Sequence, residues 1–235
     1  MPEGCRVYAI GDIHGRAQLL ETLLGKIEDD LSTSKLQDVF VIFLGDYVDR
    51  GENSKKVIDL ILKWKKKGIT KVALKGNHEA MMLAYLQKPD MGELWFNNGG
   101  NATLLSYGVA MDPKLALHER LEAAQKDFKA KLPKAHADFL NSLKLSFDVG
   151  DYFFVHAGAR AGTPLNQQTE DDMLWIRGDF LESRKRFEKI VVHGHSIHWD
   201  PVVSERHISV DTGAYVTGKL TSVVLEGENV RFLQT

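Results

Sequence analysis

The chain has 235 residues, of which 43% are hydrophobic and 26% are charged, and its formal net charge is −2. This composition is ordinary for a globular protein, and the length suits one large domain, so we expect a single domain over residues 1–235. The balanced charge lacks the basic excess typical of nucleic-acid binding. No apolar run is long enough to cross a bilayer. We therefore expect neither nucleic acid nor a membrane as a partner; the sequence leaves the oligomeric state open.

The chain contains one cysteine, Cys5, and so cannot form an internal disulfide. This usage is typical of a reducing compartment. The first residues also lack the basic and apolar regions of a secretory signal. We therefore expect a cytoplasmic protein.

The first third of the chain repeats one pattern: a short apolar strand, a polar turn with glycine, and an amphipathic helix. Strands are predicted over residues 6–10, 39–44 and 71–74, and helices from 17 to about 30 and over 54–67. This alternation indicates a parallel sheet with helices packed on it. In such sheets ligands bind at the carboxyl ends of the strands, where the polar turns meet.

The middle of the chain, residues 80–145, is predicted to be a helical insertion beside this sheet. Asp112-Pro113 indicates the start of one helix, running to about Lys131, and Pro133 the start of another. Strands then return over residues 145–149, 152–155, 190–192, 207–210, 220–225 and 230–233. The last three are predicted to form a second, mainly antiparallel sheet.

The polar turns that follow the strands contain the ligands of a two-metal site. These are Asp12, His14, Asp46, Asn77, His156 and His195. Two divalent ions that share a bridging carboxylate need about eight to ten donor atoms. Mixed carboxylate, imidazole and amide donors suit Mn²⁺, Fe or Zn²⁺ better than Ca²⁺, which prefers oxygen alone. We expect two such ions, with Mn²⁺ as the first choice.

Five motifs in these turns carry a family resemblance: Gly11-Asp-Ile-His-Gly15, Gly45-Asp-Tyr-Val-Asp-Arg-Gly51, Gly76-Asn-His-Glu79, His156-Ala-Gly158 and Gly194-His-Ser196. In order and spacing they resemble the phosphoprotein phosphatase family of metallophosphoesterases, in particular its bacterial and phage serine/threonine phosphatases. Each motif alone is short enough to occur by chance, but five in order at strand ends are specific. The resemblance implies an α/β protein with the calcineurin-like fold, in which helices flank two mixed β-sheets.

The resemblance also implies a role for each matching residue. The first ion would be bound by Asp12 and His14, both ions would be bridged by Asp46, and the second would be bound by Asn77, His156 and His195. The Gly-His-Ser register selects His195 over the neighbouring His193.

Four further residues take roles from the same resemblance. His78 would be the general acid, with Asp49 orienting its ring. Arg50 would bind the phosphate, for which a planar guanidinium is well suited. Arg177 resembles a second phosphate-binding arginine of the bacterial and phage members, although a solvated arginine at a helix end remains the alternative.

These motifs predict a metal-dependent phosphomonoester hydrolase, first of all a protein phosphatase acting on phosphoserine or phosphothreonine. The alternative is a hydrolase of dinucleoside polyphosphates, such as diadenosine tetraphosphate, or of another small phosphoester. Such relatives typically carry alanine where this chain has Asp49, which favours the phosphatase. A catalytically dead scaffold would usually have lost at least one site residue, and none is lost here.

Overall fold

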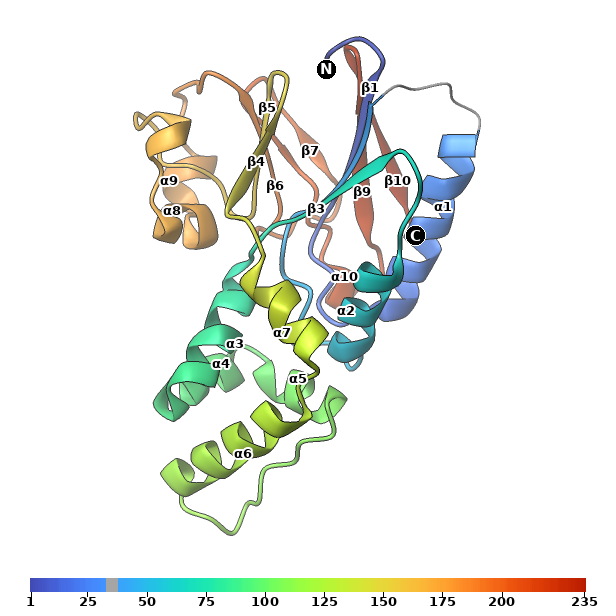
Figure 1. The fold of residues 1–235 in the computed structure, drawn as a ribbon. Helices are drawn as coiled ribbons and strands as arrows, with labels where there is room; N and C mark the ends of the chain where they lie inside the picture. Colours follow the sequence, from blue (N-terminus) through green and yellow to red (C-terminus); the bar gives the residue numbers. More distant parts are fainter. Residues whose placement is uncertain (33–37) are drawn as a thin grey trace.

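The computed structural model describes residues 1–32 and 38–235. Their strands form two five-stranded sheets, in the orders β10-β9-β1-β2-β3 and β4-β5-β6-β8-β7. The sheets face each other at one end of the molecule, and a group of helices lies beyond their edge (Figure 1). Both sheets mix parallel and antiparallel neighbours, as the fold class predicted.

The first sheet combines strands from both ends of the chain. It contains β1 (Cys5–Ile10), β2 (Asp38–Phe43), β3 (Ile69–Ala73), β9 (Thr221–Glu226) and β10 (Asn229–Gln234). The first three are parallel, as predicted, whereas β9 pairs antiparallel with β1. The prediction that β9 and β10 belong to the second sheet was wrong. The alternation of apolar and polar residues identifies the buried face of a strand, but it does not identify the strand that pairs with it.

The second sheet is built from later segments. It contains β4 (Ser146–Val149), β5 (Tyr152–Val155), β6 (Ile190–His193), β7 (Val202–Val203) and β8 (His207–Ser209). The β4–β5 hairpin turns at Gly150, which has φ +53°. Because β6 is parallel to both β5 and β8, the sheet is mixed rather than mainly antiparallel.

The space between the sheets is apolar. Alternate residues of β1 point in opposite directions: Val7 and Ala9 pack against the second sheet, while Tyr8 and Ile10 pack under the helices. The period of two is that of a strand with two buried faces. Burying this surface stabilises the arrangement by about 25 cal/mol per Å², and it places the carboxyl ends of β1 and β2 at the same edge.

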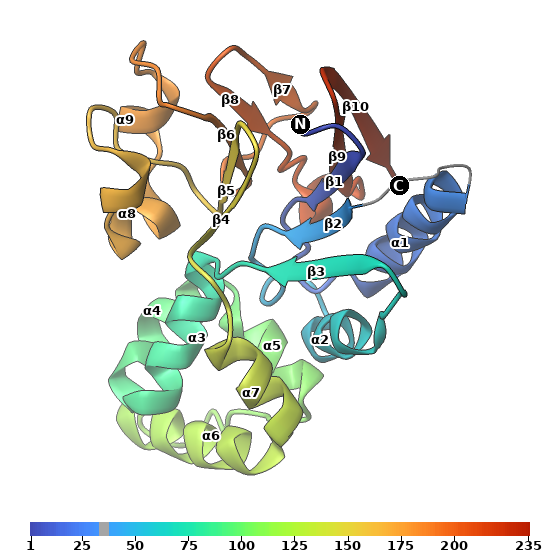
Figure 2. The same ribbon diagram turned by 45° about the horizontal axis from the view of Figure 1, so that its top comes forward.

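Helices cover the outer faces of both sheets. On the first sheet lie α1 (Ala17–Ser32) and α2 (Ser54–Lys63), and on the second α8 (Glu170–Trp175) and α9 (Gly178–Leu181) (Figure 2). Helix α2 ends four residues earlier than predicted, because Trp64 leaves the helical conformation and its indole donates to Glu28. Two short elements, η2 (Leu165–Gln167) and α10 (Ala214–Thr217), lie in loops.

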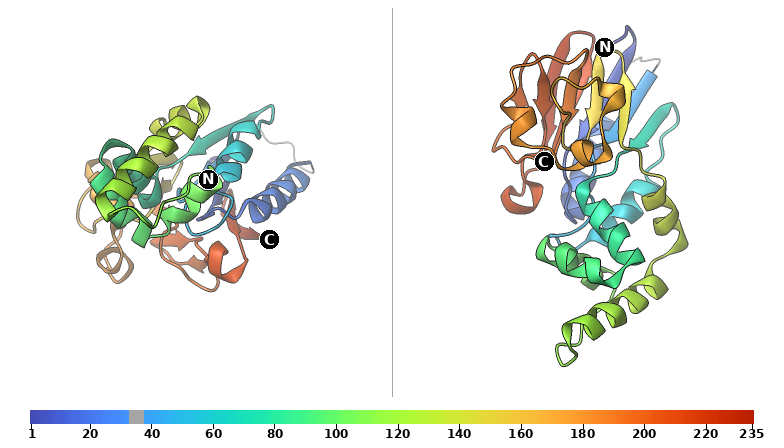
Figure 3. Two further views of the ribbon diagram at one scale, coloured as in Figure 1. Left: turned by 90° about the horizontal axis from the view of Figure 1, so that it is seen from below. Right: turned by 90° about the vertical axis from the view of Figure 1, so that its left-hand side faces the viewer.

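The middle of the chain forms the helical insertion that the sequence predicted. It contains α3 (Asn77–Gln87), η1 (Pro89–Met91), α4 (Gly92–Asn97), α5 (Gly100–Ser106), α6 (Leu117–Lys131) and α7 (Lys134–Asn141). These helices extend away from the sheets as one lobe (Figure 3, right). Helix α6 begins at Leu117 and not at Pro113, because the Asp112 side chain accepts a hydrogen bond from the Lys114 amide and forms a local turn instead. No helix among residues 1–32 and 38–235 has the length and apolarity that crossing a bilayer requires.

Candidate metal centre

The loops at the shared sheet edge have an uncommon backbone conformation. Within the described residues, the non-glycine residues with positive φ are His14, Asp46, Asp49, Arg50 and His195, at +44° to +73°. Each was a site candidate in the sequence. A left-handed non-glycine residue costs about 1–3 kcal/mol and is concentrated at functional sites. The fold therefore holds the backbone of these residues in a conformation that non-glycine residues disfavour.

Glu79 fixes the loop that follows β2. Its buried carboxylate accepts from the amides of Asp46 and Gly76 at 2.9 Å each and from the amide of Tyr47 at 2.8 Å. Burial raises the pKa of Glu79 to about 7, and the amide donors act in the opposite direction. The carbonyl of Asp46 in turn accepts from the amides of Ile13 and His14, which joins the first two loops.

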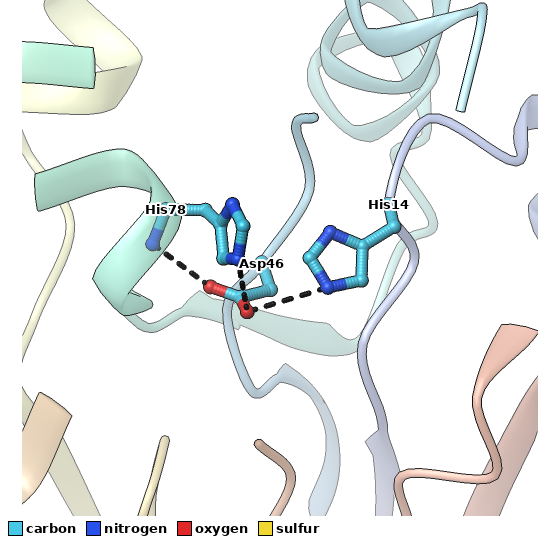
Figure 4. Close-up of side chains that lie close together, drawn as sticks. All are labelled: His14, Asp46 and His78. Atoms are coloured by element: carbon cyan, nitrogen blue, oxygen red, sulfur yellow. Dashed lines mark hydrogen bonds and ion pairs between the residues drawn. The ribbon is translucent and has the colours of Figure 1, made fainter. Parts of the chain in front are cut away.

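His14 and His78 lie on either side of Asp46 (Figure 4). The Nε2 atoms of His14 and His78 are 3.5 and 3.8 Å from Asp46 Oδ2, and the His78 amide donates to Asp46 Oδ1. One potential ligand atom from each of the three lies within 4.8 Å of the others, so the group could hold a metal ion. All three side chains are buried.

A second group contains Asp46, His156 and His195, again with ligand atoms within 4.8 Å of one another. Asn77 completes it: its Oδ1 lies 2.9 Å from both His156 Nε2 and His195 Nδ1. The carboxylate of Asp46 therefore belongs to both groups, as expected of a bridging ligand.

The ring orientations in both groups favour metal binding. His14 Nδ1 lies 2.8 Å from the Val48 carbonyl, and His156 Nδ1 lies 2.9 Å from the Leu44 carbonyl, so each ring donates its proton there. Each Nε2 then presents a lone pair to the oxygens of Asp46 or Asn77. Facing lone pairs repel, and a cation between them removes the repulsion. Such carbonyl partners commonly fix metal-binding histidines.

The electrostatics of the buried groups agree with this donor set. Burial raises the pKa of Asp46 to about 7 and lowers the pKa of His156 to about 3 and of His195 to about 2. Neutral imidazoles are the form that binds metals. Buried carboxylates without a cation are costly. The residues present therefore fit divalent cations.

Asp12 lies beside the second group. Its carboxylate accepts from the His195 amide at 3.1 and 3.2 Å, and a Cβ on Gly194 would come within 2.1 Å of Asp12 Oδ1. Burial raises the pKa of Asp12, and the carboxylates of Asp211 and Asp46 raise it further. Asp211 is thus a buried neighbour of the centre.

His78 and Asp49 form a close pair where the helical lobe meets the sheets. His78 Nδ1 lies 2.7 Å from Asp49 Oδ2, and both side chains are buried. The indole of Trp95 donates to the same oxygen at 2.8 Å, and the Thr103 hydroxyl donates to Oδ1 at 2.7 Å. Burial raises the pKa of Asp49 to about 8, while the Thr103 and Trp95 hydrogen bonds act in the opposite direction.

Two arginines border the centre on different sides. Arg50 lies 3.2 Å from His78 Nε2 and places its guanidinium 4.5 Å from the ring of Tyr215. Arg177 is exposed and donates to the His195 carbonyl at 3.1 Å. All ten site residues predicted from the sequence are therefore brought to one region.

The structure also distinguishes the remaining histidines. His193 is buried and faces His207 Nδ1 at 3.0 Å, away from the two metal-binding groups. Selecting His195 over His193 thus agrees with the geometry. Two further histidines, His136 in α7 and His207 in β8, are also buried.

Sequence reasoning assigned no role to Glu79, Trp95, Thr103 or Tyr215, although each contacts a site residue. The sequence did contain a signal for a structural role of Glu79, since this residue ends the third motif and stands at the third position of α3, where a glutamate often accepts from backbone amides. Trp95 is a buried core residue, and its hydrogen bond to Asp49 spans 46 residues. No local pattern reports such a contact.

Comparison with known proteins shows the family. The profile of the calcineurin-like phosphoesterases matches residues 5–226. Serine/threonine-protein phosphatase 2 of Escherichia coli (strain K12) is 38% identical over 96 residues, which cover 40% of this chain and 38% of that protein. The asymmetrical bis(5'-nucleosyl)-tetraphosphatase PrpE of Oceanobacillus iheyensis is 25% identical over 235 residues, 92% of this chain and 87% of that protein.

Solved structures agree on the fold. One described as a candidate diadenosine tetraphosphatase has a TM-score of 0.67 at 20% identity and covers 97% of this chain and 93% of its own. The cold-active protein-tyrosine phosphatase of a Shewanella species has a TM-score of 0.61 at 17% identity and covers 100% of this chain and 82% of its own. The family implies divalent metal ions, which the two histidine–aspartate groups could hold. This chain belongs to the calcineurin-like metallophosphoesterases, a family of hydrolases that the five motifs predicted.

Proposed function

We propose that this protein is a metal-dependent phosphomonoester hydrolase and, more narrowly, a serine/threonine protein phosphatase. One ion would be held by His14 and Asp46 of the first group together with Asp12, while His78 of that group is kept for proton transfer. The other ion would be held by Asp46, Asn77, His156 and His195. When bound, the ions would supply positive charge to the phosphoryl oxygens and acidify water for attack. We expect Mn²⁺, although the same donors suit Fe or Zn²⁺.

In this proposal His78 delivers the proton to the leaving group. Its Nδ1 donates to Asp49 Oδ2 at 2.7 Å, which holds the ring in one tautomer. Burial lowers the pKa of His78, and the neighbouring Asp46 acts in the opposite direction. Arg50 and Arg177 bind the phosphoryl oxygens as charged donors. In the described part of the chain, neither arginine has a carboxylate within 4.0 Å, so both are available to an anion.

The observation that carries the phosphatase assignment is the Asp49–His78 pair. An aliphatic alkoxide, the leaving group of phosphoserine, holds a proton about as tightly as hydroxide does, near a pKa of ~15.7. It therefore needs an acid. A nucleotide leaving group is a phosphate with a second pKa of about 6 and leaves without one. His78 is buried and oriented as a proton donor. Such an acid helps the hydrolysis of phosphoserine far more than the hydrolysis of a dinucleoside polyphosphate.

A second candidate is a dinucleoside tetraphosphate hydrolase. Relatives with that name align over nearly the whole chain: the symmetrical enzyme of Neisseria gonorrhoeae is 25% identical over 97% of it. The Escherichia coli phosphatase has higher identity over a shorter segment. This coverage supports the second candidate without addressing the leaving group.

The test compares kcat/KM of the Mn²⁺-loaded protein on a phosphoserine peptide, p-nitrophenyl phosphate and diadenosine tetraphosphate. We expect the peptide to be preferred to the dinucleotide. His78→Ala should lower kcat on the peptide by ~10²–10⁴, as loss of a general acid does. It should affect p-nitrophenyl phosphate much less, because nitrophenolate leaves without a proton.

Metal content of the variant is measured alongside, so that loss of the ions is not mistaken for loss of the acid. A clearly higher kcat/KM on the dinucleotide would reverse the assignment. An equal loss on all three substrates would refute the role of His78.

A further inference from the structure

A cavity of about 360 Å³ opens beside the metal centre, between the start of α1 and α10. Its lining includes Arg16, Gln18, Arg50, Asn53 and Tyr215. Arg50 and Tyr215 also border the centre: Arg50 contacts His78, and the ring of Tyr215 lies 5.2 Å from that of His14. The cavity is therefore continuous with the place where the phosphate would lie.

The cavity contains more positive charge than the protein itself neutralises. Among residues 1–32 and 38–235, no carboxylate lies within 4.0 Å of the Arg16 or Arg50 guanidinium, whereas Arg6, Arg160 and Arg231 each have such a partner. Glu52 also lines the cavity, but it is exposed and pairs with neither arginine. An unpaired, half-buried guanidinium retains donors for an anion.

Tyr215 contacts both arginines. Its backbone carbonyl accepts from Arg16 Nη1 at 3.4 Å, and its ring lies under the Arg50 guanidinium at 4.5 Å. The weak Arg16 contact uses one of five N–H donors, so donors of this lining residue remain for an anion in the cavity. Gln18 and Asn53 add neutral polar groups to the same wall.

We propose that this cavity is a second-anion subsite, in which Arg16 binds an anionic group of the same substrate molecule whose phosphate is bound at Arg50. The inference rests on the proposed function and extends it to substrate selection. The shared chemistry is a carboxylate or phosphate oxygen group. It is supplied either by an acidic residue flanking phosphoserine or by a further phosphate in a polyphosphate chain.

The experiment compares wild type with Arg16→Gln and Arg16→Lys. The substrates are phosphoserine peptides with glutamate or alanine at each of the two positions on either side, diadenosine tetraphosphate, and p-nitrophenyl phosphate. Lys26→Gln is the matched control, since it removes one positive charge from α1, the helix that begins directly after Arg16, away from the cavity. We expect at least one glutamate peptide to be preferred to its alanine counterpart by about tenfold. Arg16→Gln should abolish this preference, Arg16→Lys should keep part of it, and raised salt should weaken it.

Calorimetric binding of the same peptides, with a non-hydrolysable phosphonate replacing the phosphate, gives the comparison without turnover. If the proposed protein phosphatase activity is absent, the affinity ratio still tests the subsite. An Arg16→Gln loss confined to diadenosine tetraphosphate would support the subsite with polyphosphate as its anion, and would count against the phosphatase assignment alone. An equal loss on every substrate, p-nitrophenyl phosphate included, or no loss on any, would overturn the inference.

Discussion

Asp49 Oδ2 accepts the ring proton of His78 at 2.7 Å and the indole proton of Trp95 at 2.8 Å. One carboxylate oxygen thus joins the proposed general acid to the helical lobe. The geometry makes the lobe part of the site, since Trp95 belongs to α4 and Thr103, which donates to the other oxygen, belongs to α5.

Asp49→Asn tests the pair directly. An amide cannot stabilise the protonated His78 ring, so we expect kcat on a phosphoserine peptide to fall by ~10² or more. Metal content should remain unchanged, because Asp49 lies outside both metal-binding groups. Steady-state kinetics together with metal analysis check this. Unchanged turnover would remove Asp49 from the mechanism.

Trp95→Phe separates packing from hydrogen bonding. The ring remains in the aromatic cluster with Tyr85 and Phe128, but Asp49 loses one donor. Leaving a buried carboxylate short of a partner costs ~1–3 kcal/mol, so we expect a lower melting temperature and a several-fold lower kcat. Trp64→Phe is the control, because its indole donates to Glu28, remote from the site. A kcat equal to that of wild type would limit Trp95 to packing.

Metal loading tests the donor set. After treatment with Mn²⁺ we expect close to two ions per chain, and removal by a chelator should abolish hydrolysis and lower the melting temperature, since ligands of the folded state stabilise it. Asn77→Ala should reduce the content toward one ion, because Asn77 contacts the His156–His195 group only. Mass-spectrometric metal analysis decides; none or one ion in the wild type would contradict a two-metal mechanism.

Glu79→Gln should destabilise the loop after β2 without removing a metal ligand. The change keeps the shape but weakens the hydrogen bonds from the Asp46, Tyr47 and Gly76 amides. A loss of ~2 kcal/mol corresponds to roughly 4–8 °C in melting temperature for a chain of this size. Glu228→Gln, the same change at an exposed position, should leave the melting temperature within about 1 °C. Equal melting curves for both variants would refute the role of Glu79.

His136 should make stability depend on pH below 7. Burial lowers the pKa of His136 in the folded protein, although Asp59 acts in the opposite direction. As the pH falls below ~6.5, the unfolded chain therefore binds a proton that the folded chain resists, and the free energy of unfolding decreases by up to about 1.4 kcal/mol per pH unit. Denaturant titrations from pH 7 to 5 should show a shallower decrease for His136→Gln than for wild type. If stability decreased with pH equally in both proteins, His136 would be excluded as a source of the pH dependence.

The sequence predicted the βαβ beginning and the helical insertion because both depend on short-range periodicity. The strand at residues 39–44 and the helix starting at Ala17 are examples, correct to within one residue at their starts. Helix limits that depend on tertiary contacts were less accurate. Trp64 leaves α2 to contact Glu28, a residue of another helix, and no local pattern indicates that partner.

Short motifs at strand ends were enough to predict which residues would carry the chemistry, because the spacing of potential metal ligands is local in the chain. The tertiary structure alone decided that β9 pairs with β1 and that Thr103 contacts Asp49 across 54 residues. It also decided that Arg16 and Arg50 share a cavity beneath Tyr215. These relationships arise when distant segments pack together. Pairing and burial depend on which surfaces meet, and the order of residues along the chain leaves that choice open.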